Sequence, residues 1–438
     1  MANKNEMIIK VKRDRFRIDL KGSGDATIDW GNGVNETVSF TSDEILECRK
    51  EYDDVAERTV VISGDNVTYF HCKEQSSSGD FNTSIDVSHN AALKNLKCER
   101  CDVETLDVSK NTALTELMIQ SKKLTMLDVS KNVALTVLDC SYNENLTSLD
   151  LSKNVTLKDL NCSRNYILTS LDLSNNIALT RLDCSHCYDL ASLDVSKNTA
   201  LKTLICNSNK RYSKITSFDL TKNAALEELD LANNKIATLD ISKNTVLKSL
   251  NCQETDIASL DISNNIALTN LNCSQTDLTS LDISNNIALT NLDCCISKLT
   301  TLDVSSNIAL TELNCNDNGL TTLDVSNNNA LKSLVCRCNE LTTLDVSKNI
   351  ALKSLECRVN KLTALDVSNN VNIQYVNVSK NQLSSDALNN LFRSLPKAPN
   401  EENLGWNAHT GINILDNPGS RECDVKIAKK KKWKFEKY

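Results

Sequence analysis

A six-residue phrase that recurs along most of the chain constrains its fold more than any other feature. It reads apolar residue, Asp, aliphatic residue, usually Ser, one variable residue and Asn, and fourteen copies lie between Ile85 and Asn370, usually 21 residues apart. The aspartates are Asp86, Asp107, Asp128, Asp150, Asp172, Asp194, Asp219, Asp240, Asp261, Asp282, Asp303, Asp324, Asp345 and Asp366. A fixed period of this size indicates a solenoid, in which each turn stacks on the preceding one.

A second phrase lies about midway between the aspartate phrases. It reads Leu, a polar residue, then Cys or another aliphatic residue, as in Leu271–Cys273 and Leu355–Cys357. In both phrases apolar and polar residues alternate, which is the period of a strand with one face inward. We therefore expect two short strands per turn, with successive turns about 4.8 Å apart.

The asparagine that closes each aspartate phrase, from Asn90 to Asn370, is present in all fourteen copies. A side-chain amide both donates and accepts hydrogen bonds. We therefore interpret these residues as an inward ladder that satisfies backbone groups at the bend.

Twelve of the 18 cysteines occupy the inward position of the second phrase, where thiols pack as small hydrophobic side chains. Cys98 with Cys101, and Cys184 with Cys187, have the spacing of metal-binding pairs. No second pair completes a four-ligand set in the same turn, so we predict neither a metal site nor a cofactor. A thiol ladder also fits a reducing cytoplasm or an anaerobic setting better than an oxidising one.

The outward aspartates form a row in which neighbouring charges about 4.8 Å apart repel by ~1 kcal/mol even in water. Half of the phrases carry a lysine three places after the aspartate that can screen this repulsion. These are Lys110, Lys131, Lys153, Lys197, Lys222, Lys243 and Lys348. We expect serine hydroxyls or turn amides to screen the rest, with calcium as the functional alternative.

Composition narrows the class of protein. A net charge of −8 argues against nucleic acid as a partner. No apolar run reaches the ~18 residues of a membrane span, and residues 1–20 lack a continuous signal-peptide core. The four histidines are scattered and no nucleophile lies in a motif beside a base, so we predict that the chain is not an enzyme.

Both ends of the repeat array differ from its middle. Residues 1–66 read as a β-rich N-terminal cap, with strands over Ile8–Lys12, Arg17–Leu20, Ala26–Trp30 and Val38–Phe40 and a hairpin-type turn at Gly31–Gly33. Residues 67–383 form the solenoid. Residues 384–438 form a C-terminal cap with a basic tail and a helix, which Ser385 caps and Pro396 ends.

The nested ten-plus-eleven pattern resembles a bacterial subclass of leucine-rich-repeat proteins with short double-strand turns. The Asp29–Gly33 turn and the Asn417–Asp424 ending are similar to the flanks of internalin-like surface proteins of gut bacteria. The resemblance implies a β-rich, right-handed leucine-rich-repeat solenoid that binds a protein or glycan at the cell surface or after secretion. Such folds host many partners, so the ligand, the compartment, the oligomeric state and the concave side stay open.

Irregular steps single out one candidate binding surface. The three steps from Asp128 to Asp194 are 22 residues long and the step to Asp219 is 25, with the extra residues after the cysteine phrase. The bends there carry eight residues that we call the aromatic ridge. These are Tyr142, Arg164, Tyr166, His186, Tyr188, Lys210, Arg211 and Tyr212. Equivalent positions on stacked turns lie above one another, and Tyr and Arg are favoured interface anchors, so we predict a binding ridge. The alternative is that the tyrosines only cover larger turns.

Together these patterns predict a non-enzymatic interaction scaffold for a protein or glycan partner. The alternative function is a structural or adhesive rod that holds cations along the aspartate row. An accessory module of an enzyme ranks third, because it needs a catalytic neighbour on the same polypeptide.

Overall fold

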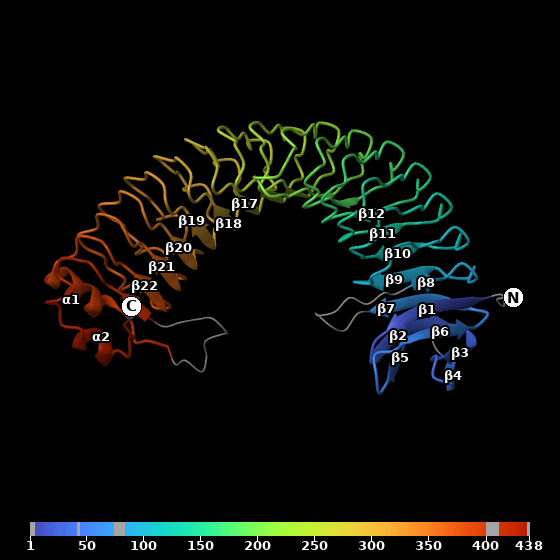
Figure 1. Cartoon of the computed structure of the whole chain (residues 1–438). Helices are drawn as coiled ribbons and strands as arrows, with labels where there is room; N and C mark the ends of the chain where they lie inside the picture. The colour runs from blue at the N-terminus through green and yellow to red at the C-terminus, as the bar shows by residue number, and fades with distance from the viewer. Residues whose placement is uncertain (1–4, 42–43, 74–83, 400–410, 436–438) are drawn as a thin grey trace. The chain divides into compact units, whose positions relative to one another are not determined.

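The computed structural model describes residues 5–41, 44–73, 84–399 and 411–435. The chain divides into two compact units, Met1–Leu226 and Glu227–Tyr438, which we call unit 1 and unit 2. Each unit is built of stacked turns of about 21 residues, and the leucine-rich-repeat solenoid expected from the repeat is confirmed (Figure 1).

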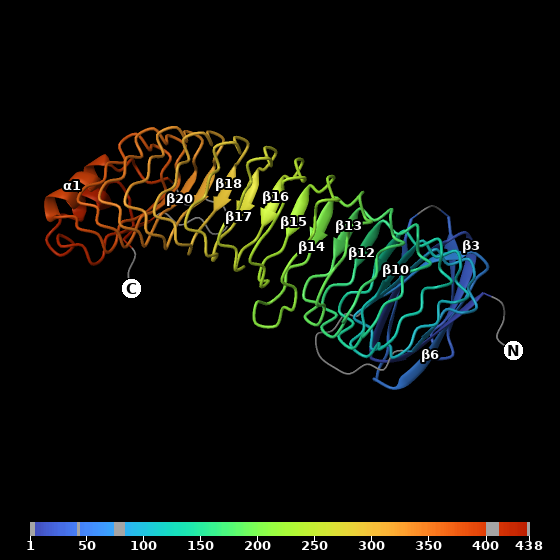
Figure 2. The same cartoon turned by 90° about the horizontal axis from the view of Figure 1, so that it is seen from above.

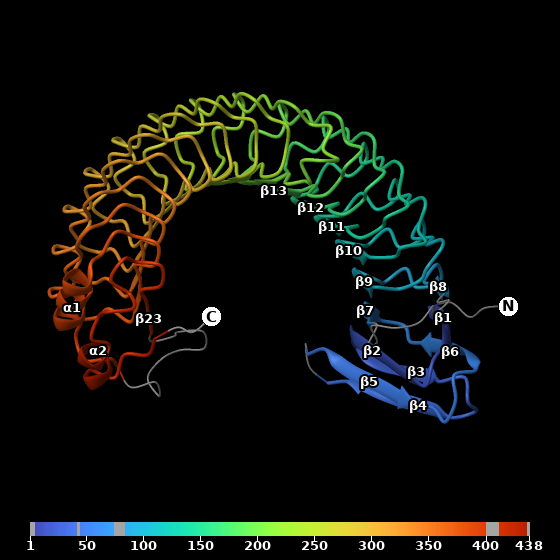
Figure 3. The same cartoon turned by 60° about the vertical axis from the view of Figure 1, so that its left-hand side comes forward.

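Six strands that pair antiparallel lie at the N-terminal end of unit 1 (Figure 3). They are β1 (Glu6–Lys12), β2 (Arg15–Gly22), β3 (Gly24–Asp29), β4 (Asn35–Phe40), β5 (Leu46–Glu51) and β6 (Glu57–Ser63). The strands and the Gly31–Gly33 turn predicted for this region are confirmed. Trp30 and Phe16 are buried between these strands with their rings edge to face, which gives this end its own apolar core.

The remaining strands come one per turn, with the exception of β8. In unit 1 they are β7 (Val67–Lys73), β8 (Ser84–Asp86), β9 (Asn95–Glu99), β10 (Glu116–Ile119), β11 (Val137–Asp139), β12 (Asp159–Asn161), β13 (Arg181–Asp183) and β14 (Thr203–Ile205). In unit 2 they are β15 (Glu228–Asp230), β16 (Ser249–Asn251), β17 (Asn270–Asn272), β18 (Asn291–Asp293), β19 (Glu312–Asn314), β20 (Ser333–Val335), β21 (Ser354–Glu356), β22 (Tyr375–Asn377) and β23 (Gly411–Asn413).

With the exception of β8, these strands form a parallel sheet in each unit (Figure 2). Equivalent residues of successive turns pair with each other. Leu138 pairs with Leu160 in unit 1, and Leu250 pairs with Leu271 in unit 2. Within each unit the strands lie on the inner side of the curve (Figure 1). The cysteine phrase therefore builds the concave face, which the sequence left open.

The prediction of a second strand in each turn is wrong for most of the array. Of the aspartate phrases that the structure describes, only the first contains a strand, β8, which pairs antiparallel with β1. The others lie on the outer side of the curve, where turns spread further apart than backbone hydrogen bonds allow. Each phrase also turns at once, as where Ser109 N donates to Asp107 Oδ1 (2.8 Å) and Asn111 N donates to the Val108 carbonyl (3.0 Å).

The predicted asparagine ladder replaces that missing strand pairing. Asn286 Nδ2 donates to the carbonyls of Ile262 (3.0 Å) and Asn265 (2.9 Å), both in the preceding turn. Asn111 makes the same two bonds to Val87 and Asn90. All fourteen of these asparagines are fully buried. Side-chain amides thus satisfy the backbone carbonyls at the outer bend, as expected.

The cysteine ladder fills the interior behind the sheet. All 18 cysteines are unpaired, and all are buried except Cys338 and Cys423, which are partly exposed. In unit 1 the Sγ atoms of Cys184 and Cys206 lie 3.3 Å apart on neighbouring turns. The expectation that thiols act here as small core side chains is confirmed by this burial.

The C-terminal end of unit 2 carries two short helices, α1 (Ser385–Ser394) and α2 (Lys426–Lys430). Helix α1 buries Leu388, Leu391 and Phe392. The predicted N-cap was wrong by one residue, because the side chain of Ser384 accepts the hydrogen bond from Ala387 N (3.2 Å). No helix within the described part of the chain is long and apolar enough to cross a membrane.

Candidate functional site

The aromatic ridge of unit 1 begins at a bend that follows each cysteine strand. Tyr142, Arg164 and His186 each lie two residues after a ladder cysteine, with φ of 59°, 59° and 57°. Their backbone N–H groups donate to carbonyls of the next turn over 2.8 to 2.9 Å, so register continues past the strand. Left-handed backbone costs a non-glycine residue about 1 kcal/mol, and these bonds compensate for it. Side chains at this bend position are therefore held in a regular row along the stacked turns.

Three tyrosines of the ridge stack on consecutive turns. The rings of Tyr166 and Tyr188 lie 5.1 Å apart and nearly parallel, at 7°. The rings of Tyr188 and Tyr212 lie 5.5 Å apart and are tilted by 43°. His186 packs edge-on against Tyr188 at 5.9 Å. The predicted stacking of equivalent bend residues is therefore present in the structure.

Cationic side chains flank the stack at both ends. The Arg164 guanidinium lies 5.0 Å from the Tyr142 ring centroid, and the Arg211 guanidinium lies 5.6 Å from that of Tyr212. Such cation–π pairs hold a guanidinium in place without neutralising its charge. Lys210 precedes Arg211 in a turn whose backbone is tied to Asn209. All eight predicted residues thus lie along four successive turns.

The ridge is accessible and locally positive. Tyr142 and Tyr212 are 43% and 52% exposed, while Tyr166 and Tyr188 are partly buried by their neighbours. Burial raises the pKa of the Tyr188 hydroxyl, Tyr166 raises it further, and Arg164 opposes this shift. Neither Arg164 nor Arg211 forms an ion pair with a described residue, whereas the nearby Asp189 is paired with Lys214 at 2.7 Å. Positive charge therefore remains uncompensated on an acidic protein.

Thiols beside the ridge are not arranged to hold a metal. Cys187 Sγ lies 3.2 Å from the Cys162 carbonyl oxygen, and Cys184 points to Cys206. Among residues placed by the structure, no group of three or more His, Cys, Asp or Glu side chains could hold a metal ion. A hydrogen bond with Cys206, and then burial, raises the pKa of the Cys184 thiol well above 9.0, so it stays protonated.

Backbone amides and serine hydroxyls screen the aspartate row, as predicted. Ser130 N donates to Asp128 Oδ1 over 2.9 Å, and the equivalent bond recurs along the row. This backbone bond, the Ser130 hydroxyl and then Lys131 lower the pKa of Asp128. Asp172 has no lysine three places on, yet the backbone and hydroxyl of Ser174 lower its pKa too. Each carboxylate is thus engaged within its own turn.

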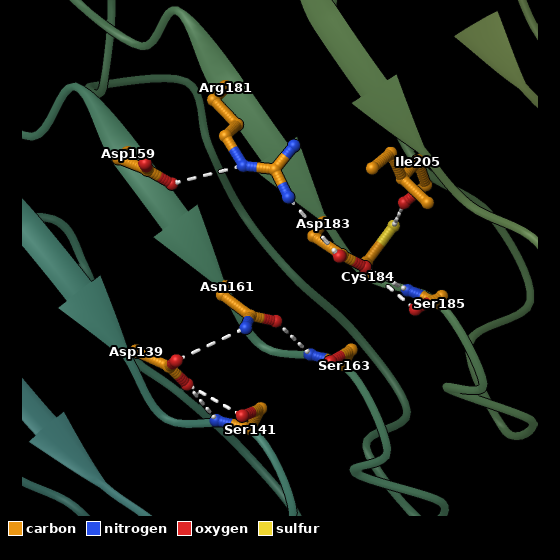
Figure 4. A network of polar contacts seen from close by, with 10 residues as sticks. All are labelled: Asp139, Ser141, Asp159, Asn161, Ser163, Arg181, Asp183, Cys184, Ser185 and Ile205. Carbon is orange, nitrogen blue, oxygen red and sulfur yellow. Dashed lines mark hydrogen bonds and ion pairs between the residues drawn. The ribbon is translucent and has the colours of Figure 1, made fainter.

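The concave sheet face is a second candidate surface. The sequence marks the outward residues of the cysteine strand, such as Met118, Ile205 and Val335, but it favours tolerated exposed residues there over a binding site. In unit 1 Arg181 pairs with Asp159 (3.8 Å) and Asp183 (3.5 Å), and Asn161 Nδ2 donates to Asp139 (3.2 Å) without cancelling its charge (Figure 4). In unit 2 a concavity of about 430 Å³ crosses β16 to β20. The alternating pattern marked these residues as outward, but it could not show which side of the turn is hollow.

Comparison with known proteins supports the fold. No family model matches the chain, and no curated protein matches its sequence. The functional domain of InlJ from Listeria monocytogenes, which includes a cysteine ladder, is 33% identical, with a TM-score of 0.61. That match covers 75% of this chain and 76% of the InlJ domain.

Two more distant structures share the fold. A leucine-rich-repeat protein of Leptospira interrogans is 21% identical with a TM-score of 0.66, and the match covers 79% of this chain and 96% of that one. An internalin of Listeria monocytogenes, InlF, is 19% identical with a TM-score of 0.56, over 65% and 87% of the two chains. Repeat, cysteine ladder and fold agree with the InlJ match. The chain therefore belongs to the bacterial leucine-rich-repeat proteins and is similar to the internalins.

Proposed function

We propose that this chain is a non-enzymatic scaffold that binds another protein, and that the aromatic ridge of unit 1 is a specific contact surface. The stacked, partly exposed tyrosines on consecutive turns, Tyr166, Tyr188 and Tyr212, carry the proposal. Interface anchors are enriched in Tyr and Arg, because these side chains combine buried area with directed polar contacts. Solenoids of this class use their extended surfaces for binding.

The charge of the ridge indicates the chemistry of the partner. The whole chain has a net charge of −8, but Arg164 and Arg211 present guanidinium groups against aromatic rings and have no carboxylate partner among the residues that the structure describes. An acidic segment with aromatic or aliphatic side chains would complement both features. Opposite charges also speed the encounter of two proteins.

The alternative functions have less support from the geometry. Buried thiols with raised pKa are poor nucleophiles, so the cysteine ladder offers no catalytic group. A rod that collects cations along the aspartate row would need carboxylate oxygens that are free to coordinate. Each aspartate of the row instead accepts a hydrogen bond from the serine or threonine two places on, as Asp219 does from Thr221. A glycan is the second candidate partner for the ridge, since Tyr212 is 52% exposed.

A displayed library of random twelve-residue peptides, selected on the whole chain, tests the proposal. We expect acidic peptides to be enriched, and we expect the variant Arg164→Ala/Tyr166→Ala/Tyr188→Ala/Tyr212→Ala to bind them at least about tenfold more weakly. Circular dichroism of both proteins checks that the variant is folded.

A matched control places four substitutions at equivalent bends of unit 2, namely Glu254→Ala, Gln275→Ala, Asp317→Ala and Val359→Ala. These residues share the left-handed φ of the ridge bends but carry no aromatic ring. Selected peptides that bind the ridge variant as tightly as the unaltered chain would refute a role for the ridge. Enrichment of no peptide, with binding of oligosaccharides instead, would favour a glycan partner.

A further inference from the structure

The concavity in the sheet of unit 2 is a surface of different chemistry from the aromatic ridge. Two parallel rows of outward side chains line it, from the first and third residues of each strand. We call the residues at this concavity the sheet-face groove: Ser249, Asn251, Asn270, Asn272, Asn291, Asp293, Glu312, Asn314, Ser333 and Val335, with the central leucines beneath. Its volume of about 430 Å³ is enough for several side chains of an extended segment.

The groove is negative and has no basic side chain in its lining. Its charged members are Asp293 and Glu312, on neighbouring strands. None of the strands β15 to β22 contains a lysine or arginine, and they add Glu228, Asp230 and Glu356 to the same sheet. Negative charge therefore accumulates along this face.

Neutral donors hold the two groove carboxylates in place. Asn291 Nδ2 donates to Glu312 Oε2 (2.8 Å), and Asn314 Nδ2 donates to Asp293 Oδ2 (3.0 Å). The backbone N–H of Cys295 donates to Asp293 Oδ1 (3.1 Å). No lysine or arginine in the described chain pairs with either carboxylate. These bonds fix the carboxylates without cancelling their charge, which lowers the entropy lost when a cation binds.

We propose that the sheet-face groove binds an extended, lysine- or arginine-bearing segment of another protein. Asp293 and Glu312 receive the cationic groups, and the rows of asparagine amides bond to the polar backbone of the segment. Charge complementarity selects this occupant, because a neutral or acidic segment would leave both carboxylates uncompensated. The proposal is independent of the aromatic ridge, whose own charge is of the opposite sign.

Fluorescence anisotropy with three labelled ten-residue peptides provides the test. The probes alternate serine with lysine, glutamine or glutamate, and the protein is the whole chain. We expect the lysine peptide to bind best, and we expect Asp293→Asn/Glu312→Gln to weaken its binding by about tenfold and to reduce its salt dependence.

The matched control removes the same charge from the outer side of turns that line the groove. In Asp261→Asn/Asp282→Asn an amide replaces each carboxylate, and Asn161 shows that asparagine still accepts the bond from the backbone two residues on (3.1 Å). We expect this variant to change binding less than about twofold, the effect of overall charge on a distant exposed site. Equal losses in both variants, or equal binding of the lysine and glutamine peptides, would overturn the proposal. The ridge variant should leave the lysine peptide bound, which separates this proposal from the one above.

Discussion

The bends of unit 1 and unit 2 share one backbone geometry but differ in what they carry. Tyr142 and Arg164 in unit 1 have the same left-handed φ as Gln275 and Ile296 in unit 2. Only unit 1 has steps of 22 and 25 residues, and only there do the extra residues add stacked tyrosines. The backbone therefore tolerates any side chain at this bend, so the ridge reflects the inserted residues and not the demands of the solenoid.

The sheet faces of the two units differ in the same way. In unit 1, Arg181 pairs with Asp159 on the preceding strand and with Asp183 on its own strand. In unit 2, Asp293 and Glu312 receive only neutral donors. A repeat that fixes the apolar positions leaves the outward positions free to diverge. One solenoid can thus carry sheet faces that differ in how their carboxylates are paired.

The largest expected effect concerns the buried thiols, which both units share. Burial raises the pKa of Cys252 and Cys357 from 9.0 to about 12. A thiol whose pKa is higher in the folded state contributes stability that is complete below pH 9 and is lost as the pH rises from 9 to 12. Each such thiol lowers the unfolding free energy by about 1.4 kcal/mol for every pH unit of increase in that window. We expect the chain to lose at least about 3 kcal/mol between pH 8 and pH 10.

Urea denaturation with a reductant at both pH values measures this loss. The variant Cys252→Ala/Cys357→Ala should show a shallower fall with pH in unit 2, and Cys162→Ala/Cys184→Ala should do the same in unit 1, where the thiol pKa values are also raised. A stability that stays flat to pH 10 would mean that these thiols are not held in an apolar interior.

The second prediction compares the asparagine ladder in the two units. Asn286→Ala leaves the buried carbonyls of Ile262 and Asn265 without their side-chain donor. Each carbonyl keeps one backbone donor, Asn265 N for Ile262 and Leu268 N for Asn265. The substitution therefore removes two hydrogen bonds, and we expect a loss of about 1–3 kcal/mol. Asn176→Ala in unit 1 should cost the same, because Asn176 makes the equivalent bonds.

Asn285→Ala and Asn175→Ala, at the exposed neighbouring positions, are the controls for loss of an amide outside the ladder. Each should cost less than about 1 kcal/mol. Denaturation midpoints with an unchanged slope give these values. Unequal costs for Asn286 and Asn176 would show that the larger turns of unit 1 rely on the ladder to a different extent.

The third prediction separates a binding role of the ridge from a covering role. Tyr188→Ala removes contacts with two rings at 5.1 and 5.5 Å. Aromatic pairs contribute about 0.5–1.5 kcal/mol each, and partial exposure keeps the sum near 1–2 kcal/mol. Ile296→Ala, at the equivalent kind of bend in unit 2 and 48% exposed, should cost less than about 0.5 kcal/mol. A loss above about 3 kcal/mol for Tyr188→Ala would favour the covering role.

Sequence reasoning reached the parts of this structure that follow from repetition alone. Stacking of Tyr166 on Tyr188 follows because equivalent residues of successive turns must lie above one another. The prediction of a strand in each aspartate phrase was wrong, because apolar–polar alternation is the same in both phrases. Alternation does not show on which side of a curved stack the turns lie close enough for backbone pairing. The helix cap failed by one residue, because Ser384 and Ser385 are the same residue type. The groove at Asp293 was missed, because its residues look like ordinary outward positions until the concave side is known.

The smallest expected effect concerns the aspartate row, which both units share. Asp150 and Asp282 each accept a backbone bond from the serine two residues on (2.9 and 3.0 Å), and that bond lowers their pKa. Carboxylates engaged within their own turns have less to gain from a cation, and the turns lack the glycine-rich spacing of calcium-binding solenoids. Melting temperatures in millimolar calcium and in chelator should therefore agree within error. A cation that binds the folded rod would raise its stability as the cation concentration rises. A melting temperature that rises with calcium would therefore favour the cation-binding rod. The effect should then be larger at Asp261 and Asp303, which have no lysine three places on, than at Asp128, which has Lys131.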